Sequence, residues 1–246
     1  AGDGVVGIWD VRGMLSGASD SPDLLRRLTG HTAAALSAVG NPVRGEIITS
    51  SMDHTVRVWD MEFGRVLSRL TPAAFSGTGQ GGFTRSVSIS ACGNVAITAG
   101  GTSEVWVWDL RTCTPVRRLI GSHLETLCAS LSSAGNEVVA GSRDGCVRIW
   151  DLGGRLQHTA PVHAAAVTSC RFSKRGAHVV TCSTDGSALI LDAFDFSEVG
   201  RWVSESALSA VDCADIKGGY VACGDEAGLV TILSTHRGIC GRWRSL

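Results

Sequence analysis

The sequence lacks several features that would assign it to a common functional class. No apolar run approaches the roughly 18 residues of a membrane-spanning helix, so the sequence predicts no membrane span. The 22 basic and 23 acidic side chains leave a net charge of −1, which excludes an overall attraction for polyanions. The nine cysteines show no Cys-x-x-Cys pair and no regular Cys/His spacing. This argues against a structural zinc site and against a disulfide framework.

These absences shape the first expectations about chemistry and compartment. Cysteines without a disulfide pattern are typical of a reducing environment. We therefore expect an intracellular protein, in the cytoplasm rather than the nucleus, without a metal or a cofactor. Apolar residues make up 44% of the chain, which is ample for a packed core, and the 31 glycines suit many tight turns between short strands.

An internal repeat dominates the sequence. The spacings between its copies are 50, 49, 42, 41 and 42 residues. A histidine lies upstream of three copies, in Gly30-His31, Gly121-Ser122-His123 and Val162-His163. The six copies are GVVGIWD ending at Asp10, TVRVWD at Asp60, EVWVWD at Asp109, CVRIWD at Asp151, SALILD at Asp192 and LVTILS at Ser234.

Repeats of about 40–45 residues, with Gly-His near the start and Trp-Asp at the end, resemble those of the WD-repeat family over the whole chain. The resemblance implies an all-β fold, a β-propeller whose blades are sheets of four short antiparallel strands. Local patterns agree: residues 166–172 and 177–183 alternate like strands around the turn Ser173–Gly176. Such units bury both faces only by stacking around an axis.

Counting strands predicts five and a half blades of an expected seven-bladed ring. Residues 1–28 supply the last two strands of a blade, and successive blades are expected at 29–70, 71–120, 121–160, 161–204 and 205–246. We expect residues 1–246 to be one propeller fragment of a longer polypeptide, with roughly 60 further residues upstream at about 42 per blade. Alternatively, another chain supplies the missing strands.

Histidine, serine and aspartate recur together in a way that suits either a hydrolase triad or a structural network. No Gly-x-Ser-x-Gly motif surrounds Ser51, and the set recurs once per blade, which favours structure over catalysis. The resemblance implies hydrogen-bonded tetrads in which Trp59 donates to Ser51, Ser51 to His31 and His31 to Asp53. The expected sets are His31, Ser51, Asp53 and Trp59; His123, Ser142, Asp144 and Trp150; and His163, Ser183 and Asp185.

One end of the propeller, the top face, is the expected partner-binding surface. A long insertion, residues 71–85, joins an outer strand to the next inner strand and carries Phe75, Phe83 and Arg85. It matches no phosphate-cradling motif. By resemblance to the family, four further residues border the central opening at this face: Met52, Glu125, Arg143 and Thr184.

The leading functional hypothesis is a non-catalytic scaffold that binds a protein or peptide partner within a larger assembly. An alternative from the family is a C-terminal sensor propeller of a multidomain enzyme, as in NACHT-type ATPases or BEACH-domain proteins. A third is a subunit of an RNA-processing or ribosome-assembly particle that uses arginines of the outer strands. We favour edge protection as the role of those arginines, because no aromatic residues are interleaved with them for base stacking.

Overall fold

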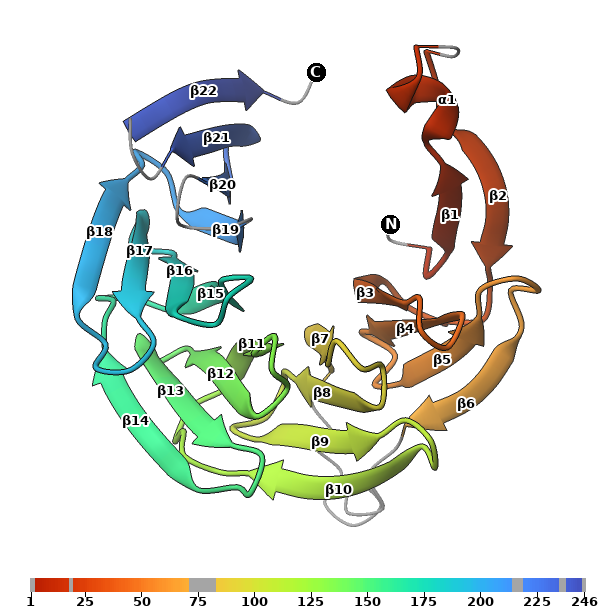
Figure 1. Cartoon of the computed structure of the whole chain (residues 1–246), viewed down its shortest axis with the longest axis horizontal. Helices are drawn as coiled ribbons and strands as arrows, with labels where there is room; N and C mark the ends of the chain where they lie inside the picture. The colour runs from red at the N-terminus through yellow and green to blue at the C-terminus, as the bar shows by residue number, and fades with distance from the viewer. Residues whose placement is uncertain (1–2, 18–19, 71–82, 214–218, 235–237, 245–246) are drawn as a thin grey trace.

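The computed structural model describes residues 3–17, 20–70, 83–213, 219–234 and 238–244, the last range by its backbone alone. Six antiparallel sheets stand side by side around a centre, as blades of a β-propeller (Figure 1). The ring is open between the two-stranded first sheet and the four-stranded last sheet. The all-β propeller expected from the repeats is confirmed.

Each complete sheet follows the chain from its innermost to its outermost strand. The first sheet contains β1 (Val6–Asp10) and β2 (Asp23–Leu28), with helix α1 (Arg12–Leu15) between them. The next two contain β3 (Ala35–Asn41), β4 (Glu46–Ser51), β5 (Val56–Asp60) and β6 (Val66–Leu70), then β7 (Ser86–Ile89), β8 (Val95–Ala99), β9 (Val105–Asp109) and β10 (Thr114–Leu119). The fourth contains β11 (Thr126–Leu131), β12 (Glu137–Ser142), β13 (Cys146–Asp151) and β14 (Leu156–Pro161). The last two contain β15 (Val167–Phe172), β16 (His178–Ser183), β17 (Ser187–Asp192) and β18 (Glu198–Val203), then β19 (Leu208–Cys213), β20 (Tyr220–Asp225), β21 (Leu229–Ser234) and β22 (Gly238–Arg244).

The hydrophobic core lies between neighbouring sheets. In one cluster, Ile48 and Val58 of the second sheet pack with Val87 and Trp108 of the third. Each of the other clusters likewise joins two neighbouring sheets of the ring. A sheet buried on both faces is rich in apolar residues rather than simply alternating, as the fully buried β4 shows. Each blade is therefore stabilised by the blades on either side of it.

The innermost strands carry hydroxyl groups that bridge to the next blade. Ser86 of β7 accepts a hydrogen bond from the backbone N–H of Ala129 on β11 and donates one to the Ala129 carbonyl (3.3 and 3.2 Å). Thr168 of β15 donates to the Leu208 carbonyl of β19 at 2.7 Å. An inner strand has no strand neighbour on its axial side, and these contacts satisfy backbone groups that would otherwise lack a partner there.

The first sheet exposes the tryptophan of its repeat. Trp59, Trp108 and Trp150 are 0%, 1% and 2% exposed, whereas Trp9 is 53% exposed. In the complete blades the tryptophan strand lies between two other strands, but β1 pairs only with β2 among the described residues. Trp9 consequently lies over Gly7 of its own strand, where its indole nitrogen is 2.6 Å from the position that a Cβ would occupy.

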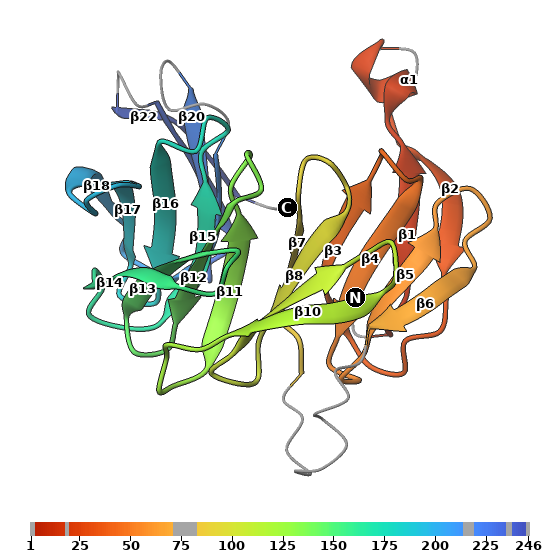
Figure 2. The ribbon, with the colours of Figure 1, turned by 60° about the horizontal axis from the view of Figure 1, so that its bottom comes forward.

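The two ends of the ring are defined by their turns. We call the end that carries the turns between the second and third strands of each blade, such as residues 52–55 and 184–186, the top face. Inner strands begin at this end, because they run antiparallel to the second strands. Helix α1 follows β1 at the opposite end and projects away from the sheets (Figure 2). No helix in the described part of the chain is long and apolar enough to cross a membrane.

The different exposure of Trp59 and Trp9 predicts that the two side chains contribute very differently to the free energy of unfolding. We expect Trp59→Ala to lower the free energy of unfolding by about 3–5 kcal/mol, because it empties a fully buried site. Trp9→Ala, which removes the same side chain from a half-exposed site, should cost less than half as much. Urea unfolding of the two variants measures both values. Equal losses would contradict the assignment of the core to the spaces between blades.

Candidate interaction face

A buried hydrogen-bonded relay fixes the top of the second sheet. The Trp59 indole donates to Thr49 Oγ1 at 2.7 Å, and Thr49 Oγ1 lies 2.7 Å from His31 Nε2. His31 Nδ1 lies 2.8 Å from Asp53 Oδ2. Since the indole only donates and an ionised carboxylate only accepts, Thr49 donates to Nε2 and the His31 proton sits on Nδ1. Gly30 precedes this histidine with φ 148°, and a Cβ there would approach Arg57 to 2.5 Å.

The carboxylate of this relay is held in its charged form. Burial raises the pKa of Asp53, but hydrogen bonds from Thr55, His31 and the Thr32 backbone outweigh that effect and hold the pKa well below its ordinary value. The Thr55 hydroxyl donates at 2.6 Å and the Thr32 N–H at 3.0 Å. The relay thereby ties the loop of His31 to the turn between β4 and β5.

The central hydroxyl differs from the one expected. Ser51 was expected between Trp59 and His31, but its hydroxyl donates to the Ala33 carbonyl at 3.0 Å and accepts from the Asp53 N–H at 3.1 Å. The register explains the correction: Trp59 pairs with Ile47, and its indole reaches Thr49, two residues further along β4. Threonine also stands two residues before the serine in TSS and TCS of two units, which is the signal that could have identified it.

The fifth sheet has the same relay without a tryptophan. His163 Nε2 lies 2.8 Å from Thr181 Oγ1, and its Nδ1 lies 3.2 Å from Asp185 and 2.9 Å from the Ser187 hydroxyl. Ser183 was expected in this set, but its hydroxyl accepts from the Asp185 N–H at 3.1 Å. Burial lowers the pKa of His163, so that it is neutral at pH 7 despite the nearby carboxylate. Hydrogen bonds from Ser187, opposed by burial, lower the pKa of Asp185 to about 2.

The fourth sheet does not form the expected tetrad. His123 is exposed, and Trp150 donates to the Ile120 carbonyl at 3.2 Å rather than to a hydroxyl. Ser142 instead donates to Asp144, and the buried Arg148 donates to both of them, at 2.7 Å in each case. The physical reason is that Ala140 stands where the second and fifth sheets have threonine, so a buried histidine would find no hydroxyl partner there.

Three of the expected partner-binding residues occupy one recurring position on the top face. Met52, Arg143 and Thr184 directly follow the second strands of their sheets, and all three are exposed. Their backbone N–H groups donate to the residue preceding the inner strand, as Arg143 does to the carbonyl of Glu125 at 2.9 Å. The Arg143 guanidinium also lies 3.7 Å from the Glu125 carboxylate. These residues therefore lie on a rigid frame at the top of their blades.

The described end of the long insertion also lies at the top face. Phe83 is half-buried, and the guanidinium of the exposed Arg85 lies 5.7 Å from the centre of its ring. The Arg85 N–H donates to the Ala99 carbonyl at 2.9 Å. Gly100, with φ 130°, permits this crossing, because a Cβ there would lie 2.3 Å from the Arg85 nitrogen. Phe75 lies outside the described residues.

A cavity of about 240 Å³ opens at the mouth of the central channel. The sequence-based prediction missed most of its lining, including Arg171. The signal that could have identified Arg171 was a charged residue within an otherwise uncharged inner strand, AVTSCRF. Its lining comes from the beginnings of all five inner strands, with Arg171 deeper on β15: Leu36, Ser37, Arg85, Ser86, Leu127, Cys128, Thr168, Ser169, Arg171 and Ser209.

Among the described residues, no group of three His, Cys, Asp or Glu side chains could hold a metal ion.

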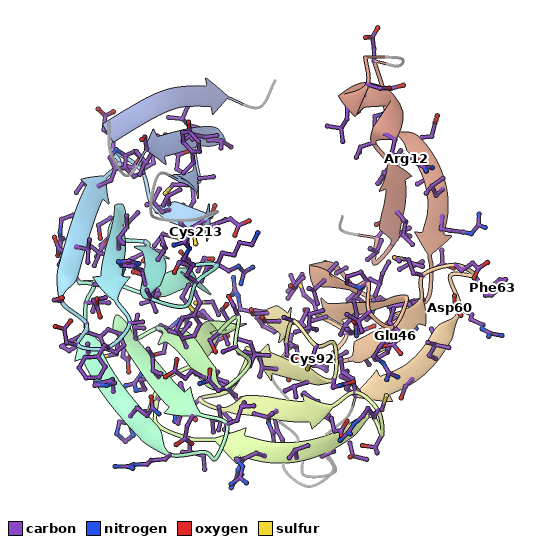
Figure 3. All side chains as sticks on the ribbon, in the orientation of Figure 1. Arg12, Glu46, Asp60, Phe63, Cys92 and Cys213 are labelled. Atoms are coloured by element: carbon purple, nitrogen blue, oxygen red, sulfur yellow. The ribbon has the colours of Figure 1, made fainter. Side chains whose placement is uncertain are left out.

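Arginines on the outer strands lie in a different electrostatic setting. Arg118 lies 3.1 Å from Glu104, Arg201 lies 2.7 Å from Glu198, and Arg65 lies 3.7 Å from Asp60. Arg65 also stacks over Phe63, at 5.5 Å, on the outer side of the ring (Figure 3). These three arginines at the outer rim are thus paired with carboxylates.

The ring of antiparallel sheets, the Trp-Asp strand ends and the buried His–Asp relays define a β-propeller built from WD repeats. The family model described as "WD domain, G-beta repeat" matches residues 22–60, 113–151 and 154–192. These three segments of the chain are therefore WD repeats.

The curated relatives that this chain matches are longer proteins. Autophagy-related protein 16 of Arabidopsis thaliana is 26% identical over 247 residues, which cover 96% of this chain and 44% of that protein. Transcription initiation factor TFIID subunit 5 of Caenorhabditis elegans is 28% identical over 68% of this chain and 24% of its own length. Eukaryotic translation initiation factor 3 subunit I of Drosophila pseudoobscura pseudoobscura is 25% identical over 78% of this chain and 61% of its own length. This chain thus spans from about a quarter to about three fifths of these relatives.

The relay predicts that replacing its threonine lowers the free energy of unfolding more than replacing a threonine that bonds tryptophan alone. Thr49→Val leaves both Trp59 and His31 without their shared buried partner, and we expect a loss of about 3 kcal/mol in the free energy of unfolding. Thr98→Val is the matched control: Thr98 accepts from Trp108 at 2.9 Å in a unit without the histidine, so about 1–2 kcal/mol should be lost. Equal losses in urea unfolding would contradict the central role of Thr49.

The lowered pKa values predict acid sensitivity. Asp185, with a pKa of about 2 when folded and 3.8 as the ordinary value, stabilises the fold above about pH 4 and ceases to do so as the pH falls toward 2. His163 acts in the same direction, because its lowered pKa makes the unfolded chain bind protons first below about pH 6.5.

Unfolding free energies measured in urea from pH 7 to pH 3 check this prediction. The wild-type protein should lose about 1 kcal/mol more than Asp185→Asn over that range. The exposed Asp20→Asn should follow the wild-type curve. A constant difference between wild type and Asp185→Asn at every pH would be the contrary result.

Proposed function

We propose that this chain is a non-catalytic interaction platform that binds a protein or peptide partner through its top face, as part of a larger intracellular assembly. The observation that carries the proposal is the grouping of exposed Met52, Arg143 and Thr184 with Phe83 and Arg85 on one end of the ring. Aromatic and arginine side chains of this kind are enriched at protein interfaces. The rigid blades beneath them supply a preorganised surface.

The buried state of the relays supports a non-catalytic role. Thr49, which is the only hydroxyl within hydrogen-bond distance of His31 Nε2 among the described residues, has no exposed surface. A nucleophile must reach its substrate, and this hydroxyl is enclosed between Trp59 and His31. The relay therefore satisfies buried polar groups rather than activating an oxygen for attack.

The relatives support membership of an assembly. Two of them are, by name, subunits of transcription and translation initiation factors. The eight cysteines of the described part are free thiols, which supports a reducing compartment. The acidic partners of Arg118 and Arg201 favour a protein ligand over a nucleic acid at these two positions, because a paired arginine offers little net charge to a phosphate backbone.

The test is partner capture by the protein with an altered top face. We expect a Met52→Ala, Phe83→Ala, Arg143→Ala triple variant to lose partners that the wild-type protein retains in quantitative affinity purification from its own cells. Phe63→Ala is the matched control, because Phe63 is also stacked by an arginine but lies on the outer rim (Figure 3).

Two outcomes of this experiment would contradict the proposed top-face function. Retention of all partners by the triple variant, with unchanged thermal stability, would remove the top face as the binding surface. Loss of the same partners in Phe63→Ala would instead assign binding to the rim.

A further inference from the structure

A groove lies between the fourth and fifth sheets at the bottom face, which is the end of the ring opposite the top face. We call it the bottom groove. Its volume is about 700 Å³, within the range of roughly 300–1,000 Å³ that is typical of ligand sites. The fourth sheet lines it with Glu137 and residues 155–158, and the fifth sheet with Ala177 and residues 192–194. These two sheets are neighbours in the ring (Figure 1).

The bottom groove exists because alanine stands where two other blades have leucine. Leu110, Leu152 and Ala193 each directly follow the aspartate that ends the third strand of their sheet, β9, β13 or β17. Leu110 is 1% exposed in the core between the second and third sheets, and Leu152 packs against the core between the third and fourth. Ala193 lacks the side chain that fills those two interfaces. The corresponding part of the interface between the fourth and fifth sheets is therefore hollow.

The facing turn of the fifth sheet is also built of small residues. Each residue after the aspartate donates a backbone hydrogen bond to this turn, and the acceptor is Asn94, Asn136 or, in the fifth sheet, the Ala177 carbonyl at 3.0 Å. Gly176 precedes Ala177 with φ 74°, and no described atom lies within 4 Å of the position that its Cβ would occupy. Small side chains on both turns therefore keep the groove open.

An exposed aromatic ring stands at the edge of the groove. Phe194 is 84% exposed, and its N–H donates to Asp192 Oδ1 at 2.8 Å. Phe196 in the same turn has φ 59°, a left-handed conformation that is strained for a bulky residue. Its ring lies 5.6 Å from that of His158 on β14. The turn that presents Phe194 is thus held against the opposite wall, and an exposed aromatic side chain on a fixed turn is typical of a binding hot spot.

Two charged side chains of the lining have no partner among the described residues. Glu137 begins β12 and Arg155 directly precedes β14, and neither side chain forms an ion pair or a hydrogen bond within the described ranges. Their counterparts in the second sheet, Glu46 and Arg65, lie 2.9 and 3.7 Å from a charge of opposite sign. A ligand that carries one basic and one acidic group would complement both charges of the groove.

We propose that the bottom groove binds a short segment of a partner protein, with an aliphatic side chain in the space beside Ala193 and a basic and an acidic residue on either side of it. The aliphatic side chain takes the place that Leu110 and Leu152 fill in their own interfaces. The basic residue faces Glu137, and the acidic residue faces Arg155. This site is at the opposite end of the ring from the proposed top-face function and does not depend on it, so that the chain can hold one partner at each end.

The experiment uses the full chain and three fluorescein-labelled peptide pools. Every pool has a lysine on one side of a central residue and a glutamate on the other, in both orders, within degenerate sequence. The central residue is leucine, alanine or aspartate. We expect fluorescence anisotropy to show the leucine pool binding at least tenfold more tightly than the alanine pool, because leucine buries more apolar surface. The aspartate pool should show no saturable binding.

The most informative variant is Ala193→Leu, because it supplies from the chain itself the side chain that the peptide is proposed to bring. It should weaken binding of the leucine pool at least tenfold. Its thermal unfolding midpoint should equal or exceed that of the wild type, since Leu110 and Leu152 occupy the corresponding position in two other interfaces. Phe194→Ala, which removes an exposed ring, should weaken the same pool about fivefold without changing the midpoint.

Charge variants and two controls complete the series. Glu137→Gln and Arg155→Gln should each weaken the leucine pool about threefold. Phe63→Ala is the matched control for the aromatic ring, because it removes an exposed phenylalanine from the corresponding turn of the second sheet. It should bind the leucine pool like the wild type, and so should the triple variant of the top face.

Three outcomes overturn the proposal. Equal binding of the leucine and alanine pools removes the aliphatic anchor. Undiminished binding by folded Ala193→Leu and Phe194→Ala variants removes the groove, and loss of binding in the triple variant of the top face would then assign the peptide to that face. Absence of saturable binding by the leucine pool also overturns the proposal, while the partner-capture experiment independently decides the top-face function.

Discussion

The hydroxyl contacts between neighbouring inner strands are the constraint on which the rest of this propeller depends. An inner strand has a sheet partner on one side only, and its other edge would expose a row of backbone groups around the axis. Ser86 and Thr168 meet this problem by bonding the backbone of the next inner strand. Short side chains are needed for this, because a longer one would hold the blades apart. The same short residues leave a cavity at the mouth of the channel.

The relays of the top face solve a second problem of buried polarity. A histidine and a tryptophan nitrogen inside a packed blade each require a partner. Thr49 serves both in one blade, and Thr181 serves the histidine alone in another, where leucine replaces tryptophan. The fourth blade has Ala140 in place of this threonine and an exposed His123, and the Arg148–Asp144 pair ties its turn instead. Different residue sets thus achieve the same result, a second-to-third strand turn held firmly against its blade.

The sequence alone was sufficient to predict the propeller architecture and to select the top face as the candidate binding surface. Trp-Asp at a period near 42 resembles the repeats of the WD-repeat family, which implies four-stranded blades, and such units bury both faces only by stacking around an axis. The hydrogen-bond partners within the relays were harder to predict from the sequence. β4 is buried along its whole length, so its pattern of exposure does not distinguish Thr49 from Ser51, and only the pairing of β4 with β5 makes that choice. His123 was misassigned because Gly-Ser-His resembles the motif, while the missing hydroxyl, at Ala140, lies 17 positions away.

The lining of the cavity required structure, because Arg85 and Arg171 are separated in the sequence by more than a third of the chain. Arg85 follows a long insertion and Arg171 ends an ordinary-looking strand, and no local pattern relates them. Both line one cavity, although Arg85 directly precedes β7 and Arg171 is the next-to-last residue of β15. A propeller converts positions one blade-length apart into neighbours around a channel, so side chains that are scattered in sequence can act on one group. The lining of this cavity is therefore a property of the ring as a whole, because every inner strand contributes to it.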